Sequence, residues 1–206
     1  MAATPDFASY VRCMEEIKRR LNAIDEIMGG RRTTSYKYTN HEFVCLQFRK
    51  IFELVVLATL ASHRHLFDKL SGRLAKEWRI AEVASIVRKK NPGFYPRPID
   101  RISASTPAIK DEWVDVNSGF LSFSELVTSH GRLGKAMHAQ NPYEQDDFFE
   151  ALSSSFPDWK RKTVRLLNNH CVDFPGKEHI LYVGMQNASD GSVHAAFFEK
   201  VKQQRP

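Results

Sequence analysis

The chain has 206 residues, of which 42% are hydrophobic, 11% aromatic and 26% charged. These values exclude a disordered or fibrous chain, and the length predicts a single domain over residues 1–206 with a sizeable core. Thirty Lys and Arg against 24 Asp and Glu give a formal net charge of +6. This excess favours a polyanionic partner such as nucleic acid, although many soluble proteins of other function are equally basic.

Cysteine usage and the apolar stretches indicate the compartment. Cys13, Cys45 and Cys171 are far apart and form no C-x-x-C pair, which is typical of a reducing cytosol and argues against a disulfide framework or a zinc cluster. The N-terminal residues lack the positive and apolar regions of a signal peptide. The longest apolar stretch, residues 43–61, is interrupted by charged side chains and is a poor membrane span. We therefore expect a cytoplasmic protein that needs no membrane, metal ion or organic cofactor.

The first predicted helix begins at Thr4-Pro5-Asp6, where a hydroxyl N-cap precedes a proline and an acid, and it ends at Gly29-Gly30. Apolar residues between these points recur in alternating steps of three and four. This heptad-like seam predicts packing along another helix of the chain or along its copy in a homodimer. The seam covers only about three heptads, so the intramolecular alternative is favoured. Its residues are Phe7, Tyr10, Met14, Ile17, Leu21, Ile24 and Met28.

Residues 31–40 form a basic, aromatic connector after this helix. Arg31, Arg32 and Lys37 lie close in sequence to two tyrosines. Cationic side chains beside tyrosines suit phosphate contact and base stacking, so we assign these three cations to a candidate nucleic-acid surface. The alternative is a solvated loop whose tyrosines fold onto the bundle.

The second predicted helix, residues 41–63, follows a capping box that starts at Thr39 and is apolar on nearly every face. Such a helix is expected at the centre of the fold, with the other helices around it. Arg49 and Glu53 stand one turn apart in it, and we interpret them as an ion pair at its rim.

The third predicted helix, residues 67–90, has one strongly basic side that ends in Arg88, Lys89 and Lys90. A run of charges is usually a solvated face. In a chain with this positive charge, the same side also suits nucleic acid, so these three residues are likewise candidates for nucleic-acid binding.

The second half of the chain is broken into shorter elements. The fold class predicted for the whole chain is mainly α: a five-helix bundle over residues 4–170 around the central helix, with a C-terminal β-hairpin and short extra strands. The remaining predicted elements are extended pieces at 99–103 and 113–116 within an irregular insertion over 91–120, a fourth helix from the capping box at Ser122 to 138 or 139, a fifth from 144 to about 170 split at Pro157, and a hairpin over 178–202.

Basic, imidazole and amide groups gather at the end of the fourth predicted helix. Arg132 and His138 lie six residues apart, and Asn141 follows them. Lys135, between them, is a further candidate for nucleic-acid binding. An arginine that holds a phosphate and a histidine that moves a proton suffice to cleave RNA without a metal ion. The other interpretation is an ordinary basic helix end, where His138 bonds near the terminal carbonyls and Arg132 faces water. The sequence motifs of P-loop, dinucleotide-binding, zinc-protease and α/β-hydrolase enzymes are absent.

The Arg132 and His138 pattern, in a helical and basic chain, resembles the HEPN superfamily of ribonuclease and toxin domains, helical bundles that carry an arginine and a histidine a few residues apart on or beside a late helix. The resemblance implies a metal-independent endoribonuclease or RNA-processing protein, related to toxins or phage defence, that forms a homodimer with a shared cleft. It implies that His138 is the general base on a ribose 2′-hydroxyl and that Arg132 clamps the scissile phosphate. The chain departs from the family pattern at Leu133, where members commonly have a polar residue, and Asn141 is the nearby polar side chain for a supporting role.

Two non-enzymatic functions stay open on the sequence. The chain could be a basic helical module that binds nucleic acid or a protein partner, or a structural dimer joined through the seam of the first helix. Loss of RNA cleavage on substitution of Arg132 or His138 identifies the enzyme, and salt-dependent nucleic-acid binding separates the module from the structural dimer.

Overall fold

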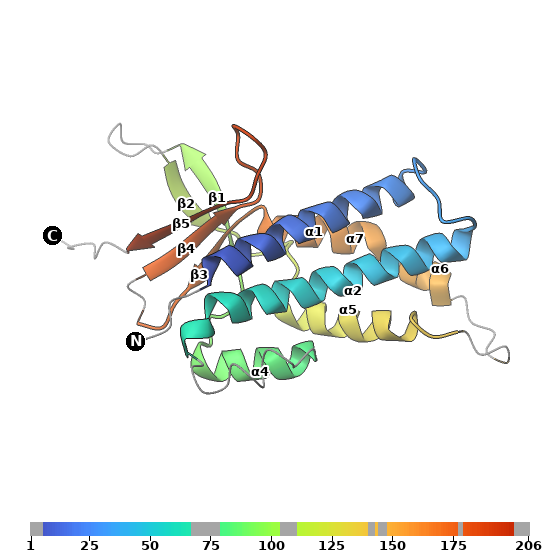
Figure 1. Cartoon of the computed structure of the whole chain (residues 1–206), viewed down its shortest axis with the longest axis horizontal. Coiled ribbons are helices and arrows are strands. Elements are labelled where there is room, and N and C mark those ends of the chain that lie inside the picture. The colour runs from blue at the N-terminus through green and yellow to red at the C-terminus, as the bar shows by residue number, and fades with distance from the viewer. Residues whose placement is uncertain are drawn as a thin grey trace.

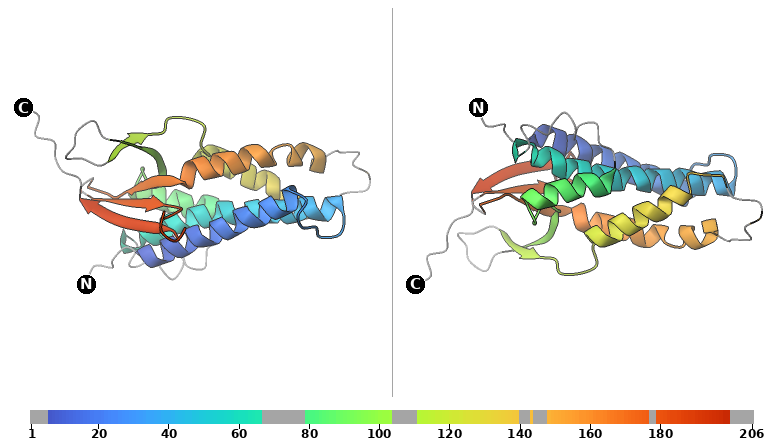
Figure 2. Two further views of the ribbon diagram at one scale, coloured as in Figure 1. Left: turned by 90° about the horizontal axis from the view of Figure 1, so that it is seen from above. Right: turned by 90° about the horizontal axis from the view of Figure 1, so that it is seen from below.

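The structure, a computed structural model, describes residues 6–66, 79–103, 111–139, 143, 148–176 and 179–199. Helices form an elongated bundle, and a five-stranded antiparallel sheet packs at one end of it (Figures 1 and 2). No helix in these ranges is both long and apolar enough to cross a membrane. The elements are α1 (Phe7–Met28), α2 (Lys37–Ser62), η1 (Arg64–Leu66), α4 (Ile80–Lys90), β1 (Arg97–Ser103), β2 (Asp111–Asp115), α5 (Phe123–Lys135), α6 (Phe148–Ser153), α7 (Phe156–Leu167), β3 (Asn169–Asp173), β4 (His179–Gly184) and β5 (His194–Glu199).

Helix α1 uses its predicted seam inside the chain. Asp6 caps the helix, because its Oδ1 accepts the backbone N–H of Ser9 at 2.9 Å, whereas the predicted cap, Thr4, lies outside the described residues. Gly29 ends the helix as expected. Since α1 lies along α2 (Figure 1), packing within one chain covers the seam, as the intramolecular alternative requires. The buried seam residues are Tyr10, Met14, Ile17, Leu21 and Ile24.

Helix α2 is central only on part of its circumference. Phe48 and Phe52 have no exposed surface, in keeping with the predicted central position. Leu46 and Leu57, however, are each 37% exposed, and Lys50 between them is exposed as well. These three positions recur on one side of the helix. The expectation that other helices cover α2 on every face is therefore wrong, and this helix keeps a solvent-facing side.

The N-terminal ends of α2 and α5 differ in how well the sequence predicts them. Ser122 and Glu125 form the predicted capping box of α5, with the Glu125 N–H donated to Ser122 Oγ at 3.3 Å and the Ser122 N–H to Glu125 Oε2 at 3.0 Å. Helix α2, in contrast, starts at Lys37, earlier than predicted. Thr39 therefore lies in its first turn, where its Oγ1 accepts the N–H of Tyr36 at 3.4 Å.

Helix α5 ends at Lys135, so it stops before His138 and not after it. The N–H groups of Met137 and His138 bond three residues back, to the carbonyls of Gly134 and Lys135, both at 3.2 Å. Such bonds tighten the chain out of the α-helix. The histidine of the predicted site consequently stands on the turn that follows the helix.

The third predicted helix is described only in part, and the fifth is divided. Only α4 represents the third predicted helix, since residues 67–78 lie outside the described ones. The fifth predicted helix is two helices, α6 and α7, separated at residues 154–155. Pro157 does not make the break but follows it, in the first turn of α7, where a missing backbone N–H leaves no helical hydrogen bond unmade.

The sheet is larger than the predicted hairpin. The hairpin is present as β4 and β5, and the two predicted extended pieces are β1 and β2, paired from Ile99↔Asp115 to Ser103↔Asp111. The strand order is β2-β1-β3-β4-β5. Strand β3 was not predicted; it pairs with β4 along its length and joins β1 only through Arg97↔Cys171 and Pro98↔His170. The predicted hairpin and short extra strands are thus present, but they belong to one five-stranded sheet, and the last helix ends at Leu167, before the predicted limit of the bundle at residue 170.

Both faces of this sheet bury side chains. Val172 and Val183 join the core of the bundle on one face. On the other face Trp113 of β2 stacks on the ring of Tyr182 at 5.0 Å and meets Phe198 of the far edge strand β5 at 5.3 Å. Residues from the two edges touch only if the sheet is strongly coiled. The coiled sheet encloses a second, smaller core around Tyr182.

Replacement of Phe52 by alanine is predicted to lower the free energy of unfolding by about 3–5 kcal/mol, because the ring is fully buried and leaves a cavity. Leu57→Ala on the exposed side of the same helix is the matched control and should cost well under half of this. Urea unfolding measures both. Equal losses at the two sites would contradict the orientation of α2.

A buried histidine should make stability depend on pH. His170 donates Nδ1–H to the Leu167 carbonyl at 2.8 Å and accepts the hydroxyl of Tyr10 at Nε2 at 2.7 Å. Burial lowers the pKa of His170 to about 4. A histidine in the unfolded chain has a pKa near 6.5. Between about pH 4 and pH 6.5 the unfolded chain therefore binds a proton at His170, whereas the folded chain does not.

Folding stability should consequently fall as the pH falls from about 6.5 to about 4, by up to about 1.4 kcal/mol per pH unit from this group. His170→Gln removes this slope, whereas His194→Gln, at an exposed position, leaves it. Urea unfolding across this pH range measures the slopes. An unchanged slope in His170→Gln would refute the assignment.

Candidate functional site

Arg132 lies on the exposed side of α5 and faces α7. Its guanidinium carbon is 5.6 Å from the centre of the Trp159 ring, a cation–π contact. Trp159 is 5% exposed, so a core residue supports the arginine from below. The guanidinium can therefore meet a phosphate from solvent while its position is held by the ring.

His138 is exposed on the turn after α5. Within the described residues, its imidazole has no hydrogen-bond partner. Leu133, the residue at which the chain departs from the HEPN pattern, is fully buried and cannot supply a polar group. Asn141, the predicted supporting residue, lies outside the described residues.

Four aromatic rings connect the end of α5 to the connector between α1 and α2; we call them the aromatic ladder. Centroids are 5.6 Å apart for Phe148–Phe149, 6.0 Å for Phe149–Tyr38 and 6.1 Å for Tyr38–Tyr36. Lys135 lies at one end, with its Nζ 5.1 Å from the centre of Phe148. The ladder thus joins α5, α6 and the start of α2, and its two tyrosines are 46% and 58% exposed.

The predicted basic connector lies at the same end of the molecule. Figures 1 and 2 show the connector, α6 and the last turn of α5 at the end of the bundle away from the sheet. Arg31 Nε donates to Glu26 at 2.9 Å, and Arg32 Nε is 3.9 Å from the same carboxylate. Lys37 pairs with Glu150 of α6. Since the two arginines share one carboxylate, the connector keeps an excess of positive charge.

Arg88, Lys89 and Lys90 belong to the opposite end. Asn91, directly after them, places its Nδ2 2.7 Å from His63 Nε2 at the C-terminal end of α2. Lys37 is the first of the 26 residues of α2, so the length of that helix, about 39 Å, separates the two basic groups. The predicted nucleic-acid-binding residues therefore lie in two separate places on the molecule.

Sequence reasoning missed a polar network that fixes α5 on α2. The predicted ion pair of Arg49 and Glu53 is present at 3.2 Å, and His130 of α5 adds its Nε2 3.1 Å from the same carboxylate. The bond from His130 lowers the pKa of Glu53, with Arg49 contributing. A Cβ at Gly134 would lie 3.3 Å from Arg49 Nη1, so this glycine gives the guanidinium room. The network orients the helix that carries Arg132.

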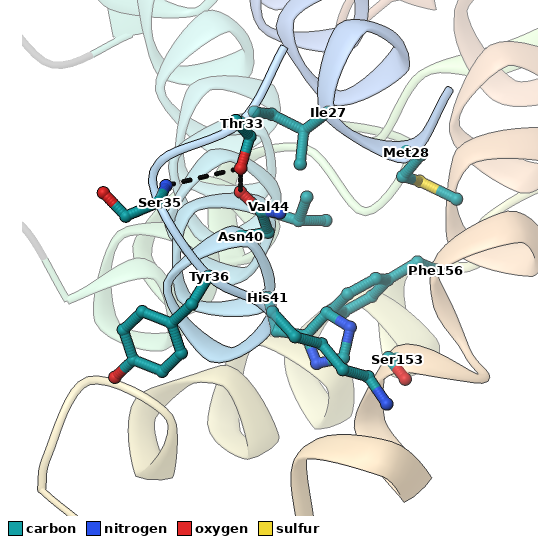
Figure 3. Close-up of a pocket in the computed structure, with 11 residues that line it drawn as sticks. Ile27, Met28, Thr33, Ser35, Tyr36, Asn40, His41, Val44, Ser153 and Phe156 are labelled. Carbon is teal, nitrogen blue, oxygen red and sulfur yellow. Dashed lines mark hydrogen bonds between the residues drawn. The ribbon is translucent and has the colours of Figure 1, made fainter. Parts of the chain in front are cut away.

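A pocket of about 520 Å³ opens beside the connector (Figure 3). Its apolar wall comes from Ile27 of α1, Val44 of α2 and Phe156 of α7. Its polar groups include Ser35 and His41, and His41 was not predicted as a site residue, because in sequence it is one polar position in the first turns of α2. The pocket lies at the same end of the bundle as the aromatic ladder.

The buried histidines elsewhere serve the fold. His63 Nδ1 lies 2.7 Å from the Thr59 carbonyl, and its Nε2 meets Asn91, so neither nitrogen is directed to a ligand. In the part of the chain that the structure describes, no three His, Cys, Asp or Glu side chains are grouped so as to hold a metal ion.

Comparison with family models, with curated protein sequences and with solved structures finds no match for this chain. Function must therefore be inferred from the residues and their arrangement.

Proposed function

We propose that the end of the bundle formed by the connector, α6 and the last turn of α5 binds single-stranded RNA and cleaves it without a metal ion. The observation that carries the proposal is the aromatic ladder from Lys135 to Tyr36, which links two predicted basic segments more than ninety residues apart in sequence. Two rings of the ladder, Tyr36 and Tyr38, are exposed beside the cations of the connector, and exposed rings next to cations are the means by which proteins hold unpaired bases and backbone phosphates together.

The chemistry follows from the two residues on α5 and its turn. His138 takes the proton of a ribose 2′-hydroxyl, the oxygen attacks the adjacent phosphorus, and the bond to the 5′-oxygen breaks. The products are a 2′,3′-cyclic phosphate and a 5′-hydroxyl, the latter protonated from solvent. Arg132 binds the non-bridging oxygens and stabilises the charge that develops on them. As the HEPN resemblance implies, two copies forming a shared cleft are part of this proposal.

A second candidate function is RNA binding without cleavage. Two observations favour it: Leu133 is fully buried, and no described side chain orients the imidazole of His138. In this alternative Arg132 and Lys135 contact phosphates and His138 is an ordinary surface residue.

The enzymatic proposal predicts that RNA cleavage persists in EDTA and leaves a cyclic phosphate. His138→Ala should lower the rate about 10²–10⁴-fold, because it removes the general base. His194→Ala, at an exposed histidine of β5 in the sheet, is the control and should cleave normally. Gel analysis of a labelled single strand measures both. Binding without cleavage in the unaltered chain establishes the second candidate instead.

The binding surface is tested by two matched triple variants. Replacing Arg31, Arg32 and Lys37 with glutamine should weaken RNA binding. It should also reduce the slope of log Kd against the logarithm of the salt concentration by about two to three. Neutralising Arg88, Lys89 and Lys90 removes the same charge from the other end of α2 and should change both much less. Fluorescence anisotropy at several salt concentrations measures these values. Equal effects of the two triples would mean that binding follows net charge and not this surface.

A further inference from the structure

The pocket beside the connector has the two kinds of wall that a flat, polar-edged ring requires. Ile27, Val44 and Phe156 give an apolar side, and hydroxyl, amide and imidazole groups give the rest (Figure 3). Its volume of about 520 Å³ lies within the range of small-molecule sites. A bare phosphate would leave the apolar side unused.

His41 presents one defined donor to this space. Within the described residues, its Nδ1 is enclosed and has no hydrogen-bond partner, and its Nε2 is not one of the enclosed atoms that lack a partner. A proton on Nδ1 would be a buried donor without an acceptor, so the neutral ring carries its proton on Nε2. Burial lowers the pKa of His41, with Lys37 acting in the same direction and Glu150 opposing. At neutral pH the ring is therefore an uncharged donor, suited to a carbonyl or ring nitrogen of a ligand.

The polar rim of the pocket is held in place before any ligand arrives. Asn40 Oδ1 accepts the Thr34 backbone N–H at 2.8 Å and the Thr34 hydroxyl at 2.9 Å. Ser35, which lines the pocket, has a φ of 126°, a conformation that residues other than glycine rarely adopt. The connector thus keeps a strained but well-bonded shape around the opening.

The charge next to the pocket also favours an uncharged ligand group. Lys37 lines the pocket and is paired with Glu150, so its ammonium is already compensated. Arg31 and Arg32 precede the pocket residues on the connector and share one carboxylate. An uncharged ring in the pocket and a phosphate at the arginines match this arrangement.

We propose that this pocket binds one nucleobase of an RNA strand, with His41 Nε2–H donating to the base edge and the base lying against the apolar side of the pocket. The inference rests on the proposed function, since it assigns a base-recognition subsite to the same RNA surface. It adds a specificity element that is separate from Arg132 and His138.

The test is a titration of the full chain with each of the four nucleoside 5′-monophosphates and with ribose 5-phosphate. Binding is monitored through the NMR signals of the histidine imidazoles. We expect at least one nucleotide to bind about tenfold or more tightly than ribose 5-phosphate, because only the nucleotides carry a base that can fill the pocket and accept a hydrogen bond from His41. His41→Ala should abolish the difference, and His41→Gln, which keeps a side-chain N–H donor, should keep part of it. His194→Ala, at an exposed histidine of β5, should bind nucleotides as the unaltered chain does.

Equal binding of ribose 5-phosphate and nucleotides would overturn the inference in favour of a phosphate site, and so would the absence of saturable binding by any of them. Urea unfolding of His41→Ala checks that a loss of binding is not a loss of fold. The titration involves no RNA cleavage. If nucleotides bind in a His41-dependent way but the chain neither binds nor cuts RNA, the proposed function is refuted and the pocket proposal stands. If the chain cleaves RNA without base selectivity, the pocket proposal is refuted and the proposed function stands.

Discussion

The candidate site depends on one packing interaction, the contact of aromatic rings between α2 and α7. The ring centroid of Phe48 lies 5.6 Å from that of Trp159 and 5.7 Å from that of Phe156. All three rings are almost completely buried. Rings of this size contribute much of the apolar area that joins two helices. Arg132 stands over Trp159 at 5.6 Å, and His41 meets Phe156 edge-on at 6.1 Å. One buried cluster therefore supports both the proposed catalytic arginine and the proposed base-binding histidine.

The sequence predicted those parts of the fold that local patterns determine. The steps of three and four in α1, the capping box at Ser122 and the runs of strand-forming residues in β4 and β5 are each visible within a few residues of sequence. Strand β3 follows α7 almost without a break, and its five residues, Asn-His-Cys-Val-Asp, lack a clear period of two. It is a strand because β4 pairs along it and because Tyr10, 160 residues away, bonds to His170. Such long-range pairing leaves no local signal.

The site was predictable to a similar extent. Arg132, Lys135 and the cations of the connector could be chosen from the sequence because charge and spacing are visible there. That these cations lie at one end of the bundle could not be predicted from the sequence. The contacts of Phe148 and Phe149 in α6 connect them, and in the sequence these two residues look like ordinary apolar helix positions. The separation of Arg88–Lys90 from the other cations likewise follows only from the length and direction of α2.

The central claim is that an RNA strand lies along the end of the bundle away from the sheet. Photo-crosslinking of a single-stranded RNA that contains 4-thiouridine to the full chain, followed by peptide mapping, tests it most directly. We expect crosslinks in the connector around Tyr36 and Tyr38 and in the segment from the end of α5 to α6. Crosslinks confined to the Arg88–Lys90 end, or none at saturating RNA, would contradict the account.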